Sequence, residues 1–128
     1  MSDSSLRLHL DELVAALRPL HKTLLAEVQH QYETAHNRVI GPAALFHLVT
    51  RDPFFAWLRP LSGLMAQLDE LLDEKDPLDP KSAAALRTEL DTLLTDGSDF
   101  SARYVALLQT SHDLVVAHAD LRRALAKV

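Results

Sequence analysis

Apolar residues recur every three or four positions through most of this 128-residue chain, and this spacing limits the possible folds more than any other feature. It is the period of one face of a helix, whereas a half-buried strand alternates at every second residue. The chain also has only three glycines, few β-branched residues and much alanine and leucine, a composition that favours helix over sheet. The sequence therefore predicts one all-α domain over residues 1–128, an antiparallel four-helix bundle with one additional short helix.

The densest apolar run lies in residues 51–76 and predicts a central buried helix. Asp52 can cap its first turn, and Pro53 suits the first helical position because its missing N–H would have no intrahelical partner there. Pro60 cannot donate a main-chain hydrogen bond and its ring crowds the preceding turn, which predicts a kink near residues 57–60.

The other helices are expected from the same spacing and from capping residues. A long first helix covers about residues 5–36, and Pro19 either kinks it or separates a short helix before it. A short helix follows at 42–50, another helix at 80–95, and the last helix runs from Ser98 towards the C-terminus. The connections between them are mostly short, which favours antiparallel neighbours.

Aromatic side chains at the start of the central helix are a candidate interface between copies of the chain. They are Phe54, Phe55 and Trp57. Aromatic residues are concentrated at the cores of protein interfaces, although at helical spacing they also suit the core of the domain itself. We expect a self-associating protein, most simply a homodimer.

Two histidines and their neighbours are a candidate pocket. His118 lies in the apolar stripe of the last helix with Ser111 on the same side, and His21 lies in the stripe of the first helix. If these two helices pack antiparallel, a hydrogen bond between His21 and Ser111 is predicted. A half-buried histidine bonded to a neighbouring group is the simpler interpretation of His118. The alternative is a pH-sensing role or a ligand pocket that also includes Trp57.

A weak metal hypothesis comes from two Glu-x-x-His pairs on the first helix. The candidate ligands are Glu27, His30, Glu33 and His36. Each pair places a carboxylate and an imidazole one turn apart, but a metal site in a helical bundle draws its ligands from several helices. We therefore assign no metal and expect no cofactor.

Acidic residues dominate the end of the central helix and the segment after it. They are Asp69, Glu70, Asp73, Glu74 and Asp76. Carboxylates at the C-terminal end of a helix oppose its dipole, so a basic group is expected nearby. Solvated carboxylates are the plainer interpretation, and a docking surface for a basic protein partner is the alternative.

Charge and motifs exclude several classes of protein. A net charge of -5 argues against nucleic-acid binding, which depends on clustered Lys and Arg. The absence of cysteine, of a secretion signal and of a long apolar run predicts a cytoplasmic protein without membrane contact. No nucleophile motif, phosphate loop or nucleotide fingerprint is present, so no catalytic residue is assigned and an enzyme is not expected.

Two segments, RDPFFAWLRPLSGLMAQLDELLD and YVALLQTSHDLVVAHADLRRAL, resemble small all-helical bacterial proteins of unknown function. The resemblance covers about residues 20–125 and implies a compact helical protein, without an activity or ligand. We interpret the chain as a non-enzymatic helical-bundle interaction or scaffold protein that self-associates. The alternative is a bundle that binds a small molecule or metal in an internal pocket.

Overall fold

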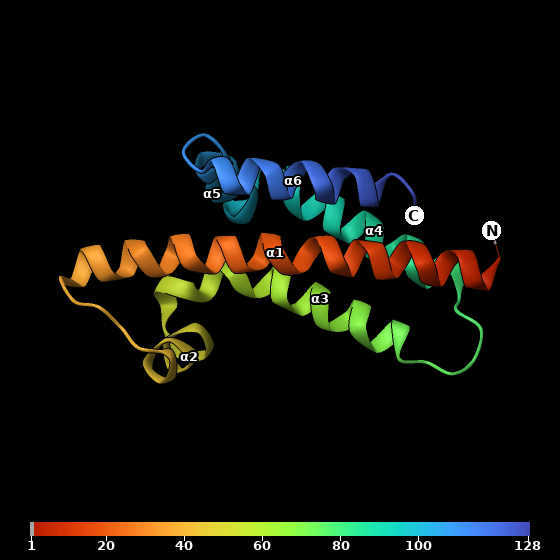
Figure 1. Ribbon diagram of the computed structural model, residues 1–128, viewed down its shortest axis with the longest axis horizontal. Helices are drawn as coiled ribbons and strands as arrows, with labels where there is room; N and C mark the ends of the chain where they lie inside the picture. Colours follow the sequence, from red (N-terminus) through yellow and green to blue (C-terminus); the bar gives the residue numbers. More distant parts are fainter. Residues whose placement is uncertain (1) are drawn as a thin grey trace.

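The computed structural model describes residues 2–128 and is organised around one long helix, α1 (Asp3–His36) (Figure 1). The chain continues through α2 (Pro42–Arg51), the 3₁₀ helix η1 (Pro53–Leu58), α3 (Arg59–Leu72), α4 (Pro80–Thr95), α5 (Asp99–Leu108) and α6 (His112–Leu125). No strand occurs within residues 2–128, so the all-α prediction is confirmed.

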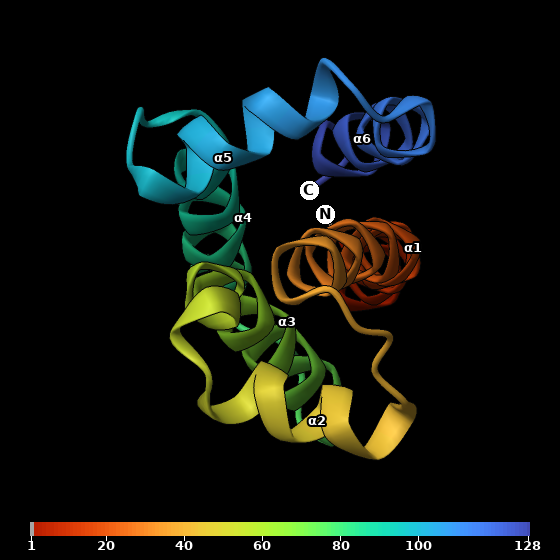
Figure 2. The same cartoon turned by 90° about the vertical axis from the view of Figure 1, so that its left-hand side faces the viewer.

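Helix α1 lies on the inner side of an arc formed by the other helices (Figure 2). Helices α3 and α6 both pack against it and run antiparallel to it, so that the two ends of the chain lie at the same end of the molecule (Figure 1). Viewed along α1, helices α4 and α5 continue from α3 round to α6, and α2 lies at the periphery below α3 (Figure 2).

One side of α1 is buried along its length. The buried side chains are Leu6, Leu10, Leu13, Val14, Leu17, Leu20, Leu24, Val28 and Tyr32. Their spacing is that of the predicted apolar stripe, and each fully buried leucine contributes roughly 1.5–3 kcal/mol relative to an exposed one. The stripe therefore predicts correctly which side of α1 faces the other helices.

Helix α1 runs through Pro19 without interruption, which decides between the two alternatives for this helix. Pro19 cannot donate a hydrogen bond to the carbonyl of Ala15. Both residues are exposed, so water can hydrate this carbonyl. The buried side chains of Leu17 and Leu20 hold the helix against its neighbours at the same level.

A change of helix type lies where the sequence predicted a kink, near residues 57–60. The 3₁₀ helix η1 ends at Leu58, and α3 begins at Arg59 with Pro60 in its first turn. The predicted cap is also formed, because the main-chain N–H of Phe54 donates to the carboxylate of Asp52 at 2.8 Å. The expected central helix is therefore two consecutive helices.

The prediction of one long last helix is wrong, because α5 ends at Leu108 and α6 begins at His112. The hydroxyl oxygen of Ser111 accepts from the N–H of Leu114 at 3.2 Å and starts the new helix. Leu107 and Leu114, on either side of the break, are seven residues apart, nearly two helical turns, so the apolar spacing stays in phase across it. Residues 2–128 thus form six α-helices, and the four-helix bundle is not confirmed.

Candidate functional site

The structure does not form the predicted hydrogen bond between His21 and Ser111. The Nε2 atom of His21 lies 3.1 Å from the hydroxyl of Ser62 on α3. Ser111 instead caps α6, because it lies in the break after α5 rather than on the face of a continuous helix. Burial lowers the pKa of His21 from its ordinary value, which favours the neutral ring in this contact.

His118 is bonded to Tyr104 across the break between α5 and α6. The Tyr104 hydroxyl lies 2.8 Å from His118 Nδ1. Tyr104 is 1% exposed and burial raises its pKa, so the hydroxyl keeps its proton and donates to the histidine ring. Burial, together with the nearby positive charge of Arg122, lowers the pKa of His118. The simpler interpretation of His118, a half-buried histidine with a neighbouring partner, is confirmed.

Trp57, the remaining predicted pocket residue, lies on a small surface hollow. Its ring packs at 5.4 Å from that of Phe100, and the guanidinium of Arg103 lies 5.8 Å from its centre. The hollow has a volume of about 320 Å³, and neither His21 nor His118 lines it. The four predicted pocket residues therefore do not share this hollow.

The residues of the weak metal hypothesis make other contacts. No three His, Asp or Glu side chains among residues 2–128 are grouped closely enough to hold a metal ion. The Glu33 carboxylate accepts the N–H of Ile40 at 2.8 Å, and the His36 ring donates to the Tyr32 carbonyl at 2.9 Å and stacks on the Tyr32 ring. Glu33 and His36 thus order the end of α1, while Glu27 and His30 make no such bond in the described chain.

The aromatic residues of η1 belong largely to the core. Phe55 is 0% exposed and packs against Tyr32 and Phe54, with ring centres 5.6 and 5.8 Å apart. The assignment of Phe55 to an interface is wrong for this fold, because the 3₁₀ turn directs its side chain into the core. Phe54 and Trp57 are half-buried, so part of each ring remains at the surface.

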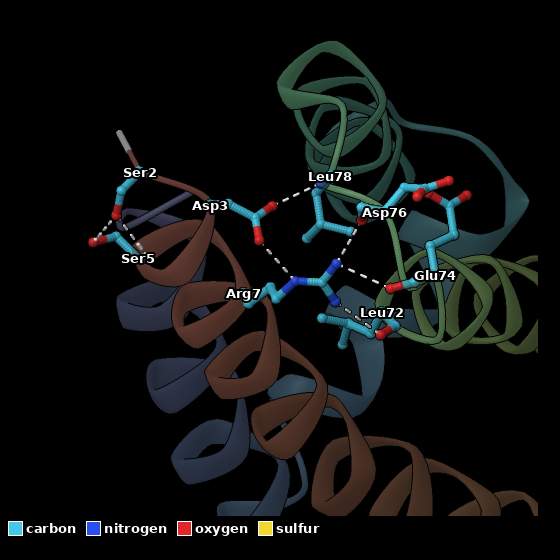
Figure 3. Close-up of polar contacts among 8 residues, drawn as sticks. All are labelled: Ser2, Asp3, Ser5, Arg7, Leu72, Glu74, Asp76 and Leu78. Carbon is cyan, nitrogen blue, oxygen red and sulfur yellow. Dashed lines mark hydrogen bonds and ion pairs between the residues drawn. The ribbon is translucent and has the colours of Figure 1, made fainter.

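The end of α3 has the basic neighbour that the sequence predicted. Arg7 of α1 donates to the carbonyl oxygens of Leu72, Glu74 and Asp76 at 3.3, 2.9 and 2.8 Å (Figure 3). Its Nε also donates to Asp3 at 3.0 Å, and Asp3 accepts the N–H of Leu78 at 2.7 Å. The Leu78 N–H and Arg7 lower the pKa of Asp3. We call Asp3 and Arg7 with these contacts the N-terminal clamp.

The clamp binds main-chain carbonyls, so it leaves the acidic side chains without a basic partner. Within residues 2–128, none of the ion pairs involves Asp69, Glu70, Asp73, Glu74 or Asp76. Their assignment as a docking surface for a basic partner stays a prediction.

Helix α2 is a surface that the sequence analysis missed. None of its residues is buried; Phe46 is 73% exposed, and Val39, just before the helix, is 89% exposed. Residues 37–51 contain Arg38, His47 and Arg51 but no Asp or Glu. The signal in the sequence that could have predicted this surface is the combination of apolar and basic residues without a carboxylate.

A groove between α3 and α4 is the second surface that was missed. Its first part, of about 500 Å³, is lined by Pro60, Gly63, Leu64, Gln67, Thr88, Glu89, Thr92, Leu93 and Asp96. Its second part, of about 320 Å³, is lined by Gln67, Glu70, Leu71, Glu74, Ser82, Ala85, Leu86 and Glu89. Gln67 and Glu89 line both parts, so the two parts adjoin, and every charged residue that lines them is acidic.

Comparisons with protein-family models, with curated proteins and with solved structures find no match for this chain. Within residues 2–128, no helix combines the length and the apolar character needed to cross a membrane. The candidate functional sites are thus two surfaces defined by their own geometry, the exposed helix α2 and the α3–α4 groove.

Proposed function

We propose that this protein is a non-enzymatic interaction protein that self-associates, and that α2 supplies the contact. The observation that carries the proposal is the exposure of Phe46 on a helix with no buried residue, together with the exposure of Val39 in the segment just before that helix. Large apolar side chains that are exposed together mark interaction sites in folded proteins. The proposed contact is therefore on α2, the helix that precedes η1, and not on the aromatic residues of η1 that the sequence predicted.

The other side of α2 is already used within the molecule. Leu45, Leu48 and Val49 are half-buried against the core, which fixes the helix in place. Phe46 and Ala43 are exposed and one turn apart, so they lie on the side that faces away. A second copy that covers Phe46 removes most of a phenylalanine side chain from water.

Loss of the Phe46 ring should weaken self-association. Burial of a phenylalanine is worth roughly 1.5–3 kcal/mol, and a symmetric dimer buries the ring once on each copy, so Phe46→Ser should raise the dissociation constant of the dimer by about a hundredfold or more. Sedimentation velocity over a range of concentrations measures this constant. The control is Val105→Ser on α5, which removes another exposed apolar side chain, 46% exposed in the structure, and should leave the constant unchanged. A wild-type protein that stays monomeric at high concentration would refute the proposed self-association.

A homodimer is the simplest assembly of this kind, since most soluble homo-oligomers have closed symmetry and dimers are the commonest. A reducing, cytoplasmic location is part of the proposal, supported by a chain without cysteine.

A second candidate function is the binding of a small molecule in the α3–α4 groove. The observation that favours it is the volume of the first part, about 500 Å³, which lies within the range of ligand sites. A ligand that binds the folded state raises the melting temperature. A thermal-shift screen together with elemental analysis of the purified protein tests this function, and a protein that gains no stability from any compound and holds no metal would refute it.

A further inference from the structure

The α3–α4 groove has an apolar floor and an acidic rim. Leu64 and Leu71 on α3 are buried, and Leu86 and Leu93 on α4 are half-buried, so the floor is built from leucine. A groove of this kind between two helices accepts a third helix that places apolar residues on the floor and charged residues at the rim.

The rim carries negative charge that the rest of the molecule does not balance. Glu70, Glu74, Glu89 and Asp96 line the groove, and none of them forms an ion pair within residues 2–128. Like charges that face one groove repel one another, and a basic occupant relieves this repulsion. The groove therefore favours a helix with arginine, lysine or histidine along its edges.

Helix α2 and the segment just before it have this chemistry on the same chain; Arg38 lies in that segment, and His47 and Arg51 lie on α2. Arg38, His47 and Arg51 are exposed, and neither arginine forms an ion pair within residues 2–128. His47 and Arg51 are four residues apart, so they lie on one edge of the helix, beside the exposed ring of Phe46. Apolar and basic groups of α2 and of the segment before it thus match the apolar floor and acidic rim of the groove.

The length of α2 also fits the length of the groove. Helix α2 has 10 residues and is about 15 Å long, and the groove follows α3 from Pro60 to Leu71, about 17 Å, before it passes the end of the helix. Gly63 lies in the first part of the groove, and apart from the neighbouring residues of its own helix no atom lies within 4 Å of the position that a Cβ would take there. This open space lets the backbone of an occupant approach α3 closely.

We propose that α2 of each copy docks into the α3–α4 groove of a second copy, so that two copies exchange the same contact. The proposal rests on the self-association proposed above and adds the surface that receives α2. A reciprocal contact of this kind is closed by a two-fold axis and stops at the dimer.

Charge reversal tests the pairing directly. One variant carries Arg38→Glu and Arg51→Glu, and the other carries Glu70→Lys and Glu89→Lys. In either variant alone, groups of the same charge meet at both contacts, and the dissociation constant should rise by about tenfold or more. In an equimolar mixture, the unchanged α2 of one variant meets the unchanged groove of the other, and the two reversed surfaces also attract. Each variant should therefore sediment as a monomer and the mixture as a heterodimer.

Matched controls separate this pairing from a general effect of net charge. Arg18→Glu with Lys22→Glu changes the net charge as the α2 variant does, and Asp11→Lys with Glu27→Lys changes it as the groove variant does. All four positions lie on α1, and none of these side chains makes an ion pair within the described residues. Both controls should dimerise as the wild type does.

Filling the groove is an independent test without a change of charge. Gly63→Trp places a large ring in the open space and should abolish dimerisation, while circular dichroism shows a folded protein. Ala66→Trp adds the same ring to an exposed position on α3 that does not line the groove, and should leave the dimer intact.

The outcomes distinguish this inference from the function on which it rests. A wild-type protein that is a monomer overturns both. A wild-type dimer that survives Gly63→Trp, or charge variants whose mixture does not pair, overturns the docking of α2 into the groove and leaves self-association standing. A wild-type dimer with the pairing described above supports both.

Discussion

Replacement of Arg7 by methionine tests whether the N-terminal clamp stabilises the fold. Arg7→Met keeps an unbranched apolar stem of similar length but removes every hydrogen bond of the guanidinium. The side chain is only 28% exposed, and it joins the first turns of α1 to the end of α3 and the segment that follows. In this variant, the segment between α3 and α4 should therefore open more readily than the rest of the fold.

The expected loss follows from the three carbonyl contacts. Hydrogen bonds that involve a charged group contribute about 1.5–3 kcal/mol each when buried. The carbonyls of Glu74 and Asp76 lie in exposed surroundings and can regain water, so we take about 1 kcal/mol for each of them and slightly more for the partly buried carbonyl of Leu72. The free energy of unfolding should fall by about 3 kcal/mol, and the melting temperature by roughly 10 °C for a domain of this size.

Thermal and urea denaturation measure this loss, with Arg18→Met as the control. Arg18 lies on the exposed face of α1 and makes no ion pair within residues 2–128. Hydrogen exchange of the Leu78 amide, which donates to Asp3, should accelerate in Arg7→Met alone. Equal melting temperatures for the two variants, together with an unchanged exchange rate at Leu78, would refute the clamp.

Gly63→Ala should raise the free energy of unfolding by up to about 1 kcal/mol, because Gly63 lies within α3 and an added Cβ meets no atom within 4 Å outside the neighbouring residues of its own helix. Urea denaturation measures this gain, and a loss of stability would contradict the prediction. The pKa values of His21 and His118 are lowered in the fold from the ordinary 6.5, so the unfolded chain binds more protons. The free energy of unfolding should therefore keep its full value above pH 6.5, where both rings are neutral in the folded and the unfolded chain. It should decline as the pH falls from 6.5 through the lower pKa values that His21 and His118 have in the folded state. Urea denaturation between about pH 7 and pH 5 should show this decline in the wild type and less of it in His21→Gln with His118→Gln, and equal slopes would disprove it.

Helix ends were predictable because the signals that define them are local. Asp52 and Asp79 each cap a helix through a bond to the main chain two residues on, as their positions before a proline indicate. Gly97, which follows α4, has a φ of 78°, a conformation that glycine adopts without strain. In each case the determining contact lies within a few residues along the chain.

The break between α5 and α6 was not predictable from periodicity. The residues that are buried on either side of it follow one continuous spacing of three and four, so a single helix and two helices give the same apolar pattern. Ser111 is the local signal, but a serine on an apolar stripe also suits a buried polar group, which is the basis of the pocket prediction. Only the packing of α6 along α1, with α5 turned away, distinguishes the two structures (Figure 2).

The sequence by itself therefore determined the helical class, the buried side of α1 and most helix ends, since helical period and capping depend on neighbours in the chain. The tertiary structure alone decided that His21 pairs with Ser62, that Arg7 holds the end of α3, that α2 remains exposed, and that an acidic groove forms between α3 and α4. These features depend on which helices meet. Contacts between residues that are far apart along the chain leave no periodic pattern in the sequence.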